Sequence, residues 1–297
     1  MILMSPAIHV GRTAEERAAF LRKVGVMDVK TVSMSTPADW SDAEVEEARR
    51  FLDDHGIRVG EFSGFHNGFG SEKVGDYQSA LEHHRHQLRH AHILGAHCVG
   101  LAILDGGVWD EEFSKTFLER DETTPEMWSE GTWHRCIAAT EDLVALAEKL
   151  QVDVAVHPHI VTPIGSVERY KALFEAVPSP RLKALMDPVN LTWPHMFFRT
   201  TELVNQIFDE LSDKITALHA KDVTMSAVKP IGGPLSVVHL DEAVPGTGGM
   251  DYATILRRLG ELEHDVTVWV EHFAYEDTIT GYQYIRHVAR EIGVTLH

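Results

Sequence analysis

Two histidines flank a proline at the point where an apolar run of the sequence ends. The run is "VDVAVHPHIV", residues 152–161, and its histidines are His157 and His159. An imidazole nitrogen can bind a divalent metal ion, and a neutral imidazole accepts protons near neutral pH. A strand that opens onto a cavity would use both properties, whereas the same residues in a plain loop would simply meet water.

Side chains that bind metals or move protons also follow other apolar runs. They are Glu61, His66 and Asn67 in "EFSGFHNGF", Asp187 and Asn190 in "LMDPVNLTW", His219, Lys221 and Asp222 in "ALHAKDV", and Glu271 and His272 in "WVEHF". Each could instead cap a strand, and Asp187 before a proline could start a turn. Carboxylates mixed with imidazoles suit Mn²⁺, Co²⁺, Fe²⁺ or Zn²⁺, whereas carboxylates alone suit Mg²⁺ or Ca²⁺ better.

The pattern of elements predicts a fold in which these run ends converge. Short β-type runs alternate with helical periodicity along the whole chain. The expected strands lie within 2–10, 26–34, 57–65, 97–104, 152–159, 182–188, 215–223 and 266–273, and the expected helices near 14–24, 41–55, 76–94, 132–150, 166–177, 200–211, 251–260 and 278–292. Eight β-then-α units fit a (β/α)8 TIM barrel. A doubly wound open sheet is the rival, but the first unit lacks its glycine-rich fingerprint.

Strand carboxyl ends meet on the catalytic face of such a barrel. Four successive expected strands would therefore deliver a histidine (His157 or His159), Asp187, His219 and Glu271 to one rim, which predicts a divalent metal site there. Two long strand-to-helix segments, 105–131 and 223–250, would lie on the same face. The first carries Trp109 and Trp128, and we expect it to act as a lid. No linker divides the chain, so we expect a single barrel domain over residues 1–297.

Composition excludes several classes of partner. The 297 residues carry a formal net charge of −18, which disfavours nucleic acid and anionic membranes. Two cysteines, Cys98 and Cys136, form neither a disulfide framework nor a zinc motif. The first residues contain no basic leader and no long apolar run, so we expect a cytoplasmic protein. His83, His86 and His90 share one expected helix face, which we interpret as solvated.

Four motifs together resemble the xylose isomerase-like TIM-barrel superfamily. They are "LMDPVNL", "HAKDV", "PGTGGMDY" and "VWVEH", and the similarity is clearest over residues 150–290. The superfamily includes sugar isomerases and epimerases such as D-tagatose 3-epimerase, inosose dehydratase, and the metal-bearing subunit of C-glycoside deglycosidases. The resemblance implies a metal bound by Glu, Asp, His and Glu after successive strands. Asp187, His219 and Glu271 occupy the last three of these positions.

The first ligand position departs from the pattern of the superfamily. The stretch there commonly reads Glu-x-His, and here it reads His157-Pro158-His159. His157 can still bind a metal, but one carboxylate of the epimerases' acid–base pair is missing. His159 stands where the resemblance implies the base of the deglycosidases. The resemblance also implies a homo-oligomer, and a deglycosidase would need a small second subunit.

The predicted chemistry is removal of a proton beside a carbonyl of a keto-sugar or polyol, assisted by a metal. Mn²⁺ is the first expectation, with Co²⁺, Fe²⁺, Zn²⁺ or Mg²⁺ as alternatives. His159 would carry the proton, Glu271 would be a second carrier, and Lys221 would orient substrate oxygens or stabilise the anion. Substrate contacts are expected from His66, Trp109, Asn190 and Trp193.

Three outcomes of that chemistry stay open. Return of the proton elsewhere would give an isomerase or epimerase, and departure of a neighbouring group would give a lyase such as a dehydratase or deglycosidase. A barrel that serves only as a binding subunit is the alternative outside catalysis. An endonuclease-type barrel is disfavoured because it would need a basic groove, and the net charge is −18.

Overall fold

The sheet of this protein consists of parallel strands that run from one edge to the other without reversal. The computed structural model describes residues 1–63, 69, 74–102, 128–160, 162–228 and 237–297. Within these residues the sheet has eight strands in the order β1-β10-β7-β6-β5-β4-β3-β2. They are β1 (Ile2–Met4), β2 (Thr31–Met34), β3 (Arg58–Phe62), β4 (Cys98–Ala102), β5 (Asp153–His157), β6 (Leu182–Met186), β7 (Ile215–His219) and β10 (Val266–Trp269). Each lies within an expected strand segment.

The two outer strands of the sheet are joined by the segment that follows β1. Ala7 forms a parallel bridge with Ser33 of β2. The Ser33 amide donates to the Pro6 carbonyl at 2.9 Å, and the Ile8 amide donates to the Ser33 carbonyl at 3.0 Å. These contacts curl the sheet into a barrel, which confirms the predicted (β/α)8 fold and rules out the open doubly wound sheet.

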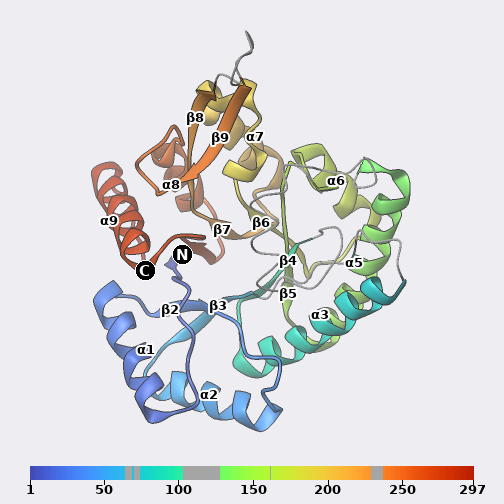
Figure 1. The fold of residues 1–297 in the computed structure, drawn as a ribbon, viewed down its shortest axis with the longest axis vertical. Coiled ribbons are helices and arrows are strands. Elements are labelled where there is room, and N and C mark those ends of the chain that lie inside the picture. The colour runs from blue at the N-terminus through green and yellow to red at the C-terminus, as the bar shows by residue number, and fades with distance from the viewer. Residues whose placement is uncertain (64–68, 70–73, 103–127, 161, 229–236) are drawn as a thin grey trace.

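Helices surround the strands as an outer ring (Figure 1). They are α1 (Ala14–Met27), α2 (Asp42–Asp54), α3 (Val74–Leu94), α5 (Glu130–Leu150), α6 (Val167–Ala176), α7 (Thr200–Leu211), α8 (Tyr252–Gly260) and α9 (Tyr275–Ile292). Ser41 caps α2 and Asp251 caps α8, at the first residues of the expected helices 41–55 and 251–260. The α5 helix begins before the predicted Thr132, because the Ser129 side chain accepts from the Thr132 amide.

Among the described residues, no helix has the length and apolarity needed to cross a membrane.

The predicted loop 223–250 proves to contain two further strands. Strands β8 (Asp222–Val228) and β9 (Val237–Ala243) pair antiparallel with each other and project from the barrel (Figure 1). The chain then returns through a tight turn in which Asp222 accepts from the Gly246 and Met250 amides. The sequence prediction missed this hairpin because its strands pair only with each other and cover little core. The segment expected to act as a lid, 105–131, lies almost entirely outside the described residues.

The inside of the barrel contains a small apolar layer directly beneath the strand carboxyl ends. Cys98, Ala155, Leu185 and Ala217 form this cluster, separate from the larger core between strands and helices. Side chains along a strand alternate between its two faces. The residues two positions after Ala155, Leu185 and Ala217 therefore also point inward. These residues are His157, Asp187 and His219.

Candidate metal centre

The four predicted ligands converge at the carboxyl end of the barrel. His157, Asp187, His219 and Glu271 each offer one donor atom, and these atoms all lie within 4.8 Å of one another. The residues lie at the end of, or within two residues after, β5, β6, β7 and β10, which are neighbours in the sheet. The Asp187 and His219 side chains are fully buried, and that of Glu271 is 4% exposed. The predicted set is thus brought together by the fold.

Asp187 has both carboxylate oxygens engaged. Its Oδ1 accepts from the Asn190 amide at 3.1 Å. Its Oδ2 lies 2.9 Å from Lys221 Nζ and 3.2 Å from His157 Nε2. Burial by itself would raise the pKa of Asp187, but the Lys221 ammonium and His157 outweigh it and hold this pKa below its ordinary value. Asp187 is therefore ionised at any physiological pH.

His219 lies between two carboxylates. Its Nδ1 is 2.9 Å from Glu271 Oε2, and its Nε2 is 3.0 Å from Glu61 Oε2. The Trp269 ring packs edge-on against the imidazole, with ring centroids 4.9 Å apart. Burial opposes a charged imidazole, but Glu271 and Glu61 together raise the pKa of His219 to about 10. Glu61 was noted at the end of its strand, but it was not among the predicted site residues.

Lys221 is an ammonium at the centre of this network. Its Nζ contacts Asp187, donates to Asn190 Oδ1 at 3.0 Å, and donates to Glu242 Oε1 at 2.6 Å. Burial opposes the charge, but these carboxylates and Glu271 raise the pKa of Lys221. An ammonium has three donors, and this one uses all of them on protein oxygens. The neighbouring Asp222 carboxylate instead accepts the backbone amides of Val223, Gly246 and Met250.

The His157-Pro158-His159 stretch supplies two neutral imidazoles. Asn190 Nδ2 lies 3.2 Å from His157 Nε2 and donates to the Pro158 carbonyl. Burial lowers the pKa of His157 against the opposing effect of Asp187. Burial likewise lowers the pKa of His159 to about 4, aided by the charge of Lys221. Both rings are unprotonated at neutral pH, the state that a metal ligand or a base requires.

Glu242 and His272 also join the site, although His272 was noted only as a strand-end residue and Glu242 was not noted at all. Glu242 comes from β9 and connects Lys221 to His272, whose Nδ1 lies 2.8 Å from Glu242 Oε2. His272 has φ +70°, a left-handed backbone conformation that is uncommon outside glycine. Its position next to Glu271 was a usable signal. Glu242 had none, because it belongs to the hairpin that the sequence prediction missed.

The predicted substrate contacts fall into three groups. His66 and Trp109 lie outside the described residues. Asn190 lies in the site, where its side chain bridges Lys221 and His157. Trp193 lies in the loop after β6 and is 41% exposed. It precedes a 3₁₀ turn, Pro194–Arg199, in which Phe198 is also exposed.

The donor set fits a divalent transition ion. Such an ion binds nitrogen and oxygen at about 2.0–2.2 Å, so its donors lie roughly 3–4.5 Å from one another. The observed 4.8 Å limit is close to this requirement. Two carboxylates would also balance the charge of a divalent ion, and the ion would take the place of the proton that Glu271 favours on His219 Nδ1. Within the described chain, this group of His, Cys, Asp and Glu side chains is the single one with such geometry.

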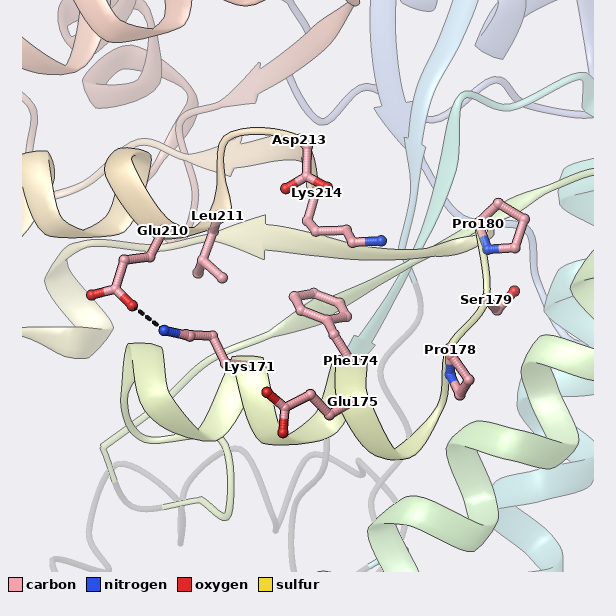
Figure 2. Close-up of a pocket in the computed structure, with 10 residues that line it drawn as sticks. All are labelled: Lys171, Phe174, Glu175, Pro178, Ser179, Pro180, Glu210, Leu211, Asp213 and Lys214. Atoms are coloured by element: carbon pink, nitrogen blue, oxygen red, sulfur yellow. Dashed lines mark hydrogen bonds and ion pairs between the residues drawn. The ribbon is translucent and has the colours of Figure 1, made fainter.

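A surface pocket at the other end of the barrel contains none of the predicted site residues. Its lining includes Lys171, Phe174, Pro180 and Lys214 (Figure 2). Lys171 pairs with Glu210 at 2.6 Å across its rim. Pro180 and Lys214 precede β6 and β7, so the pocket lies at the amino ends of these strands. In a TIM barrel, that end contributes to stability rather than to catalysis.

The histidine-rich face of α3 is packed rather than solvated. The His90 side chain is fully buried, and its Nδ1 lies 2.8 Å from Thr36 Oγ1. His83 and His86, the other two residues of this face, are half-buried. The prediction of a solvated face was wrong here because α3 packs against both α2 and α5.

Comparisons with known proteins agree on the architecture. A structure of a xylose isomerase-like TIM barrel protein from Mycobacterium smegmatis with magnesium has 17% identity and a TM-score of 0.71, and covers 98% of this chain and 97% of that chain. The IolI protein with bound zinc has 16% identity and a TM-score of 0.62, covering 97% and 98%. D-psicose 3-epimerase from Clostridium cellulolyticum H10, solved with D-tagatose, has 15% identity and a TM-score of 0.62, covering 97% and 96%.

These identities are low enough that the likeness establishes the fold alone. A search of curated protein sequences finds no match. The family model for the xylose isomerase-like TIM barrel matches residues 18–292, which is most of the sequence. This chain therefore belongs to the xylose isomerase-like TIM barrel family.

Proposed function

We propose that this protein is a divalent-metal-dependent enzyme that removes a proton beside a carbonyl of a keto-sugar or polyol, as an isomerase or epimerase. The observation that carries the proposal is the convergence of two imidazoles and two carboxylates from four neighbouring strands. They lie at the end of the barrel where this fold places its chemistry. Related folds that carry magnesium, zinc or a ketose in solved structures support the same reading.

His157, Asp187, His219 and Glu271 would hold the ion. When bound, the ion would polarise a substrate carbonyl and lower the cost of forming negative charge on its oxygen. We expect Mn²⁺ first, because the donors mix nitrogen and oxygen and leave out sulfur. Magnesium in one related fold and zinc in another keep those ions as candidates.

His159 would take the proton from the carbon. It lies two residues after the end of β5, and its pKa of about 4 leaves it unprotonated near pH 7, so that it would hold the abstracted proton only transiently. Lys221 would act through its charge, since its donors already hold Asp187, Asn190 and Glu242. A fixed positive charge there favours an anion at the substrate carbonyl. Asn190 would orient His157 and Lys221 together rather than bind substrate alone.

A lyase reaction is the second candidate, and the composition of the β5 end favours it. The resemblance implies a glutamate at position 157, and here histidine takes its place. Epimerisation needs acid–base groups on both faces of the carbon, whereas elimination needs one base and a leaving group. A 3-keto C-glycoside, with loss of the aglycone, is the substrate class that such a reaction would fit. In that case a small second subunit would complete the enzyme.

The first experiment measures metal content by mass spectrometry after purification without added metal and after dialysis against Mn²⁺, Co²⁺ or Zn²⁺. We expect about one ion per wild-type chain, and its loss in Asp187→Ala and His157→Ala. Asp209→Ala and His92→Ala, at exposed positions, are the matched controls and should keep the ion. A wild-type chain that binds none of these ions would contradict the proposal and favour a non-catalytic binding barrel.

The second experiment measures the exchange of carbon-bound hydrogen in the substrate for deuterium from the solvent. Ketoses and 3-keto glycosides are incubated in D₂O with the metal-loaded protein, and NMR records deuterium beside the carbonyl. Isomerases, epimerases and lyases of this type all share this step, so the assay covers both candidates. His159→Asn should lower the exchange rate by about 10²–10⁴-fold while metal content stays unchanged. Unchanged exchange in this variant would remove His159 as the base.

A further inference from the structure

We infer that Glu61 is a positioning residue: it fixes the ring and tautomer of His219 so that Nδ1 is presented to the cation. This inference rests on the proposed metal function. The residues that the sequence assigned to the metal all come from β5, β6, β7 and β10, whereas Glu61 lies on β3. It contacts His219 across 158 positions of sequence.

A β-bulge directs Glu61 into the barrel. Val32 of β2 pairs with Val59, and Met34 pairs with Phe62, so Ser33 alone faces both Gly60 and Glu61. An extra residue of this kind breaks the alternation of side chains and redirects one of them. Glu61 is in register with Cys98, which belongs to the apolar layer inside the barrel. Paired residues of parallel strands point to the same side, so Glu61 points inward too.

The contacts of His219 determine which of its nitrogens is left for a metal. Glu61 Oε2 lies 3.0 Å from Nε2, and in this contact the ring N–H donates and the carboxylate oxygen accepts. Nε2 must therefore carry the hydrogen. Nδ1 is the nitrogen that faces Glu271, at 2.9 Å from its Oε2. A carboxylate on the outer nitrogen both sets the tautomer and makes the inner nitrogen a stronger donor.

The burial of Glu61 supports its role in positioning His219. Its side chain is 1% exposed, and its Oε1 has no hydrogen-bond partner among the described residues. A buried carboxylate with one oxygen unsatisfied costs stability, and an apolar side chain would avoid that cost. Its other oxygen, Oε2, nevertheless contacts His219 Nε2, which is the ring nitrogen that does not contact Glu271.

The test compares Glu61→Gln and Glu61→Leu in the full chain. Gln keeps an oxygen that can accept from Nε2, and Leu keeps the volume without any acceptor. Thr36→Val is the matched control, because it removes the hydroxyl beside another buried histidine, His90 on α3, which does not belong to the ligand set. Zinc and cobalt affinities are measured by competition with a chelator. Nitrogen-15 spectra of the zinc-loaded, histidine-labelled protein report the tautomer of His219.

We expect Glu61→Leu to weaken metal binding by about 10–100-fold and to disturb the His219 tautomer signal. Glu61→Gln should recover most of the affinity and the signal, and Thr36→Val should change neither. Unchanged affinity and tautomer in both Glu61 variants would overturn the inference while leaving the metal function intact. If Glu61→Leu does not fold, Glu61→Gln decides, because a scrambled tautomer in that variant also contradicts the inference. A wild-type chain without metal would refute the proposed function and the inference with it.

Discussion

Two successive layers inside the barrel differ completely in chemistry. The lower one, Cys98, Ala155, Leu185 and Ala217, is fully buried, small and uncharged. The upper one holds His157, Asp187, His219 and Glu271, together with Lys221. Three of the strands contribute to both layers at positions only two residues apart, a step of about 6.6 Å. Positions two residues apart on one strand are thus both buried, yet one holds an apolar side chain and the other holds a polar or charged one.

The contrast shows what an apolar layer does to the charges above it. Water cannot reach the carboxylates from below, so each must be neutralised by a partner within the protein. Lys221 and His219 supply that charge, and the pKa values of Asp187 and Glu271 are lowered accordingly. A divalent ion would meet the same need, which links the stability of the upper layer to its proposed function.

Removal of the Lys221 charge should produce the largest effect. Lys221→Met leaves Asp187 and Glu271 buried without this cation, and we expect a loss of about 3–5 kcal/mol in unfolding free energy. Urea unfolding of the chelator-treated protein measures it. Lys171→Met is the matched control, because its ion pair with Glu210 is half exposed and worth at most about 1 kcal/mol. Equal effects of the two variants would contradict the contrast between buried and surface charge.

Filling the bulge beside Glu61 should have an intermediate effect. A Cβ on Gly60 would lie 2.3 Å from Ser5 Oγ and 2.8 Å from a Thr267 methyl carbon. We expect Gly60→Ala to cost about 1–3 kcal/mol and to weaken metal binding as the bulge shifts. Gly25→Ala in α1 meets nothing within 4 Å and should stabilise by about 0.4–1 kcal/mol. Thermal unfolding of both variants checks the opposite signs, and a tolerant Gly60 would argue against a rigid bulge.

The smallest effect concerns a histidine at the amino end of the barrel. His97 Nε2 lies 2.7 Å from Thr216 Oγ1, and burial lowers the pKa of His97 against the opposing charges of Asp153 and Asp265. A folded-state pKa below the unfolded one gives stability above about pH 6.5 that is lost as pH falls through the folded value. Between pH 7 and pH 5 the unfolding free energy should fall less in His97→Gln than in wild type. The two slopes should differ by at most about 1.4 kcal/mol per pH unit. The exposed His92→Gln should match wild type. A slope in His97→Gln equal to that of wild type would mean that protonation of His97 does not destabilise the folded protein.

Much of the site could be predicted because of where its residues stand along the chain. His157, Asp187, His219 and Glu271 each follow a β-type run, and parallel strands must bring such positions to one face. Glu242 could not be found this way, since its hairpin pairs only with itself. Glu61 was visible at a strand end, but its partner was not, because a one-residue bulge decides the direction of its side chain.

The sequence by itself determined the alternation of strands and helices, the barrel and the family, because hydrophobic period and chain order specify them locally. It also determined which residue types stand at the strand ends. Only the tertiary structure decided that Lys221 lies among Asp187, Asn190 and Glu242, and that His219 lies between Glu61 and Glu271. The physical reason is that charge pairing inside a barrel depends on register, bulges and the return path of a hairpin, which join residues far apart in the chain.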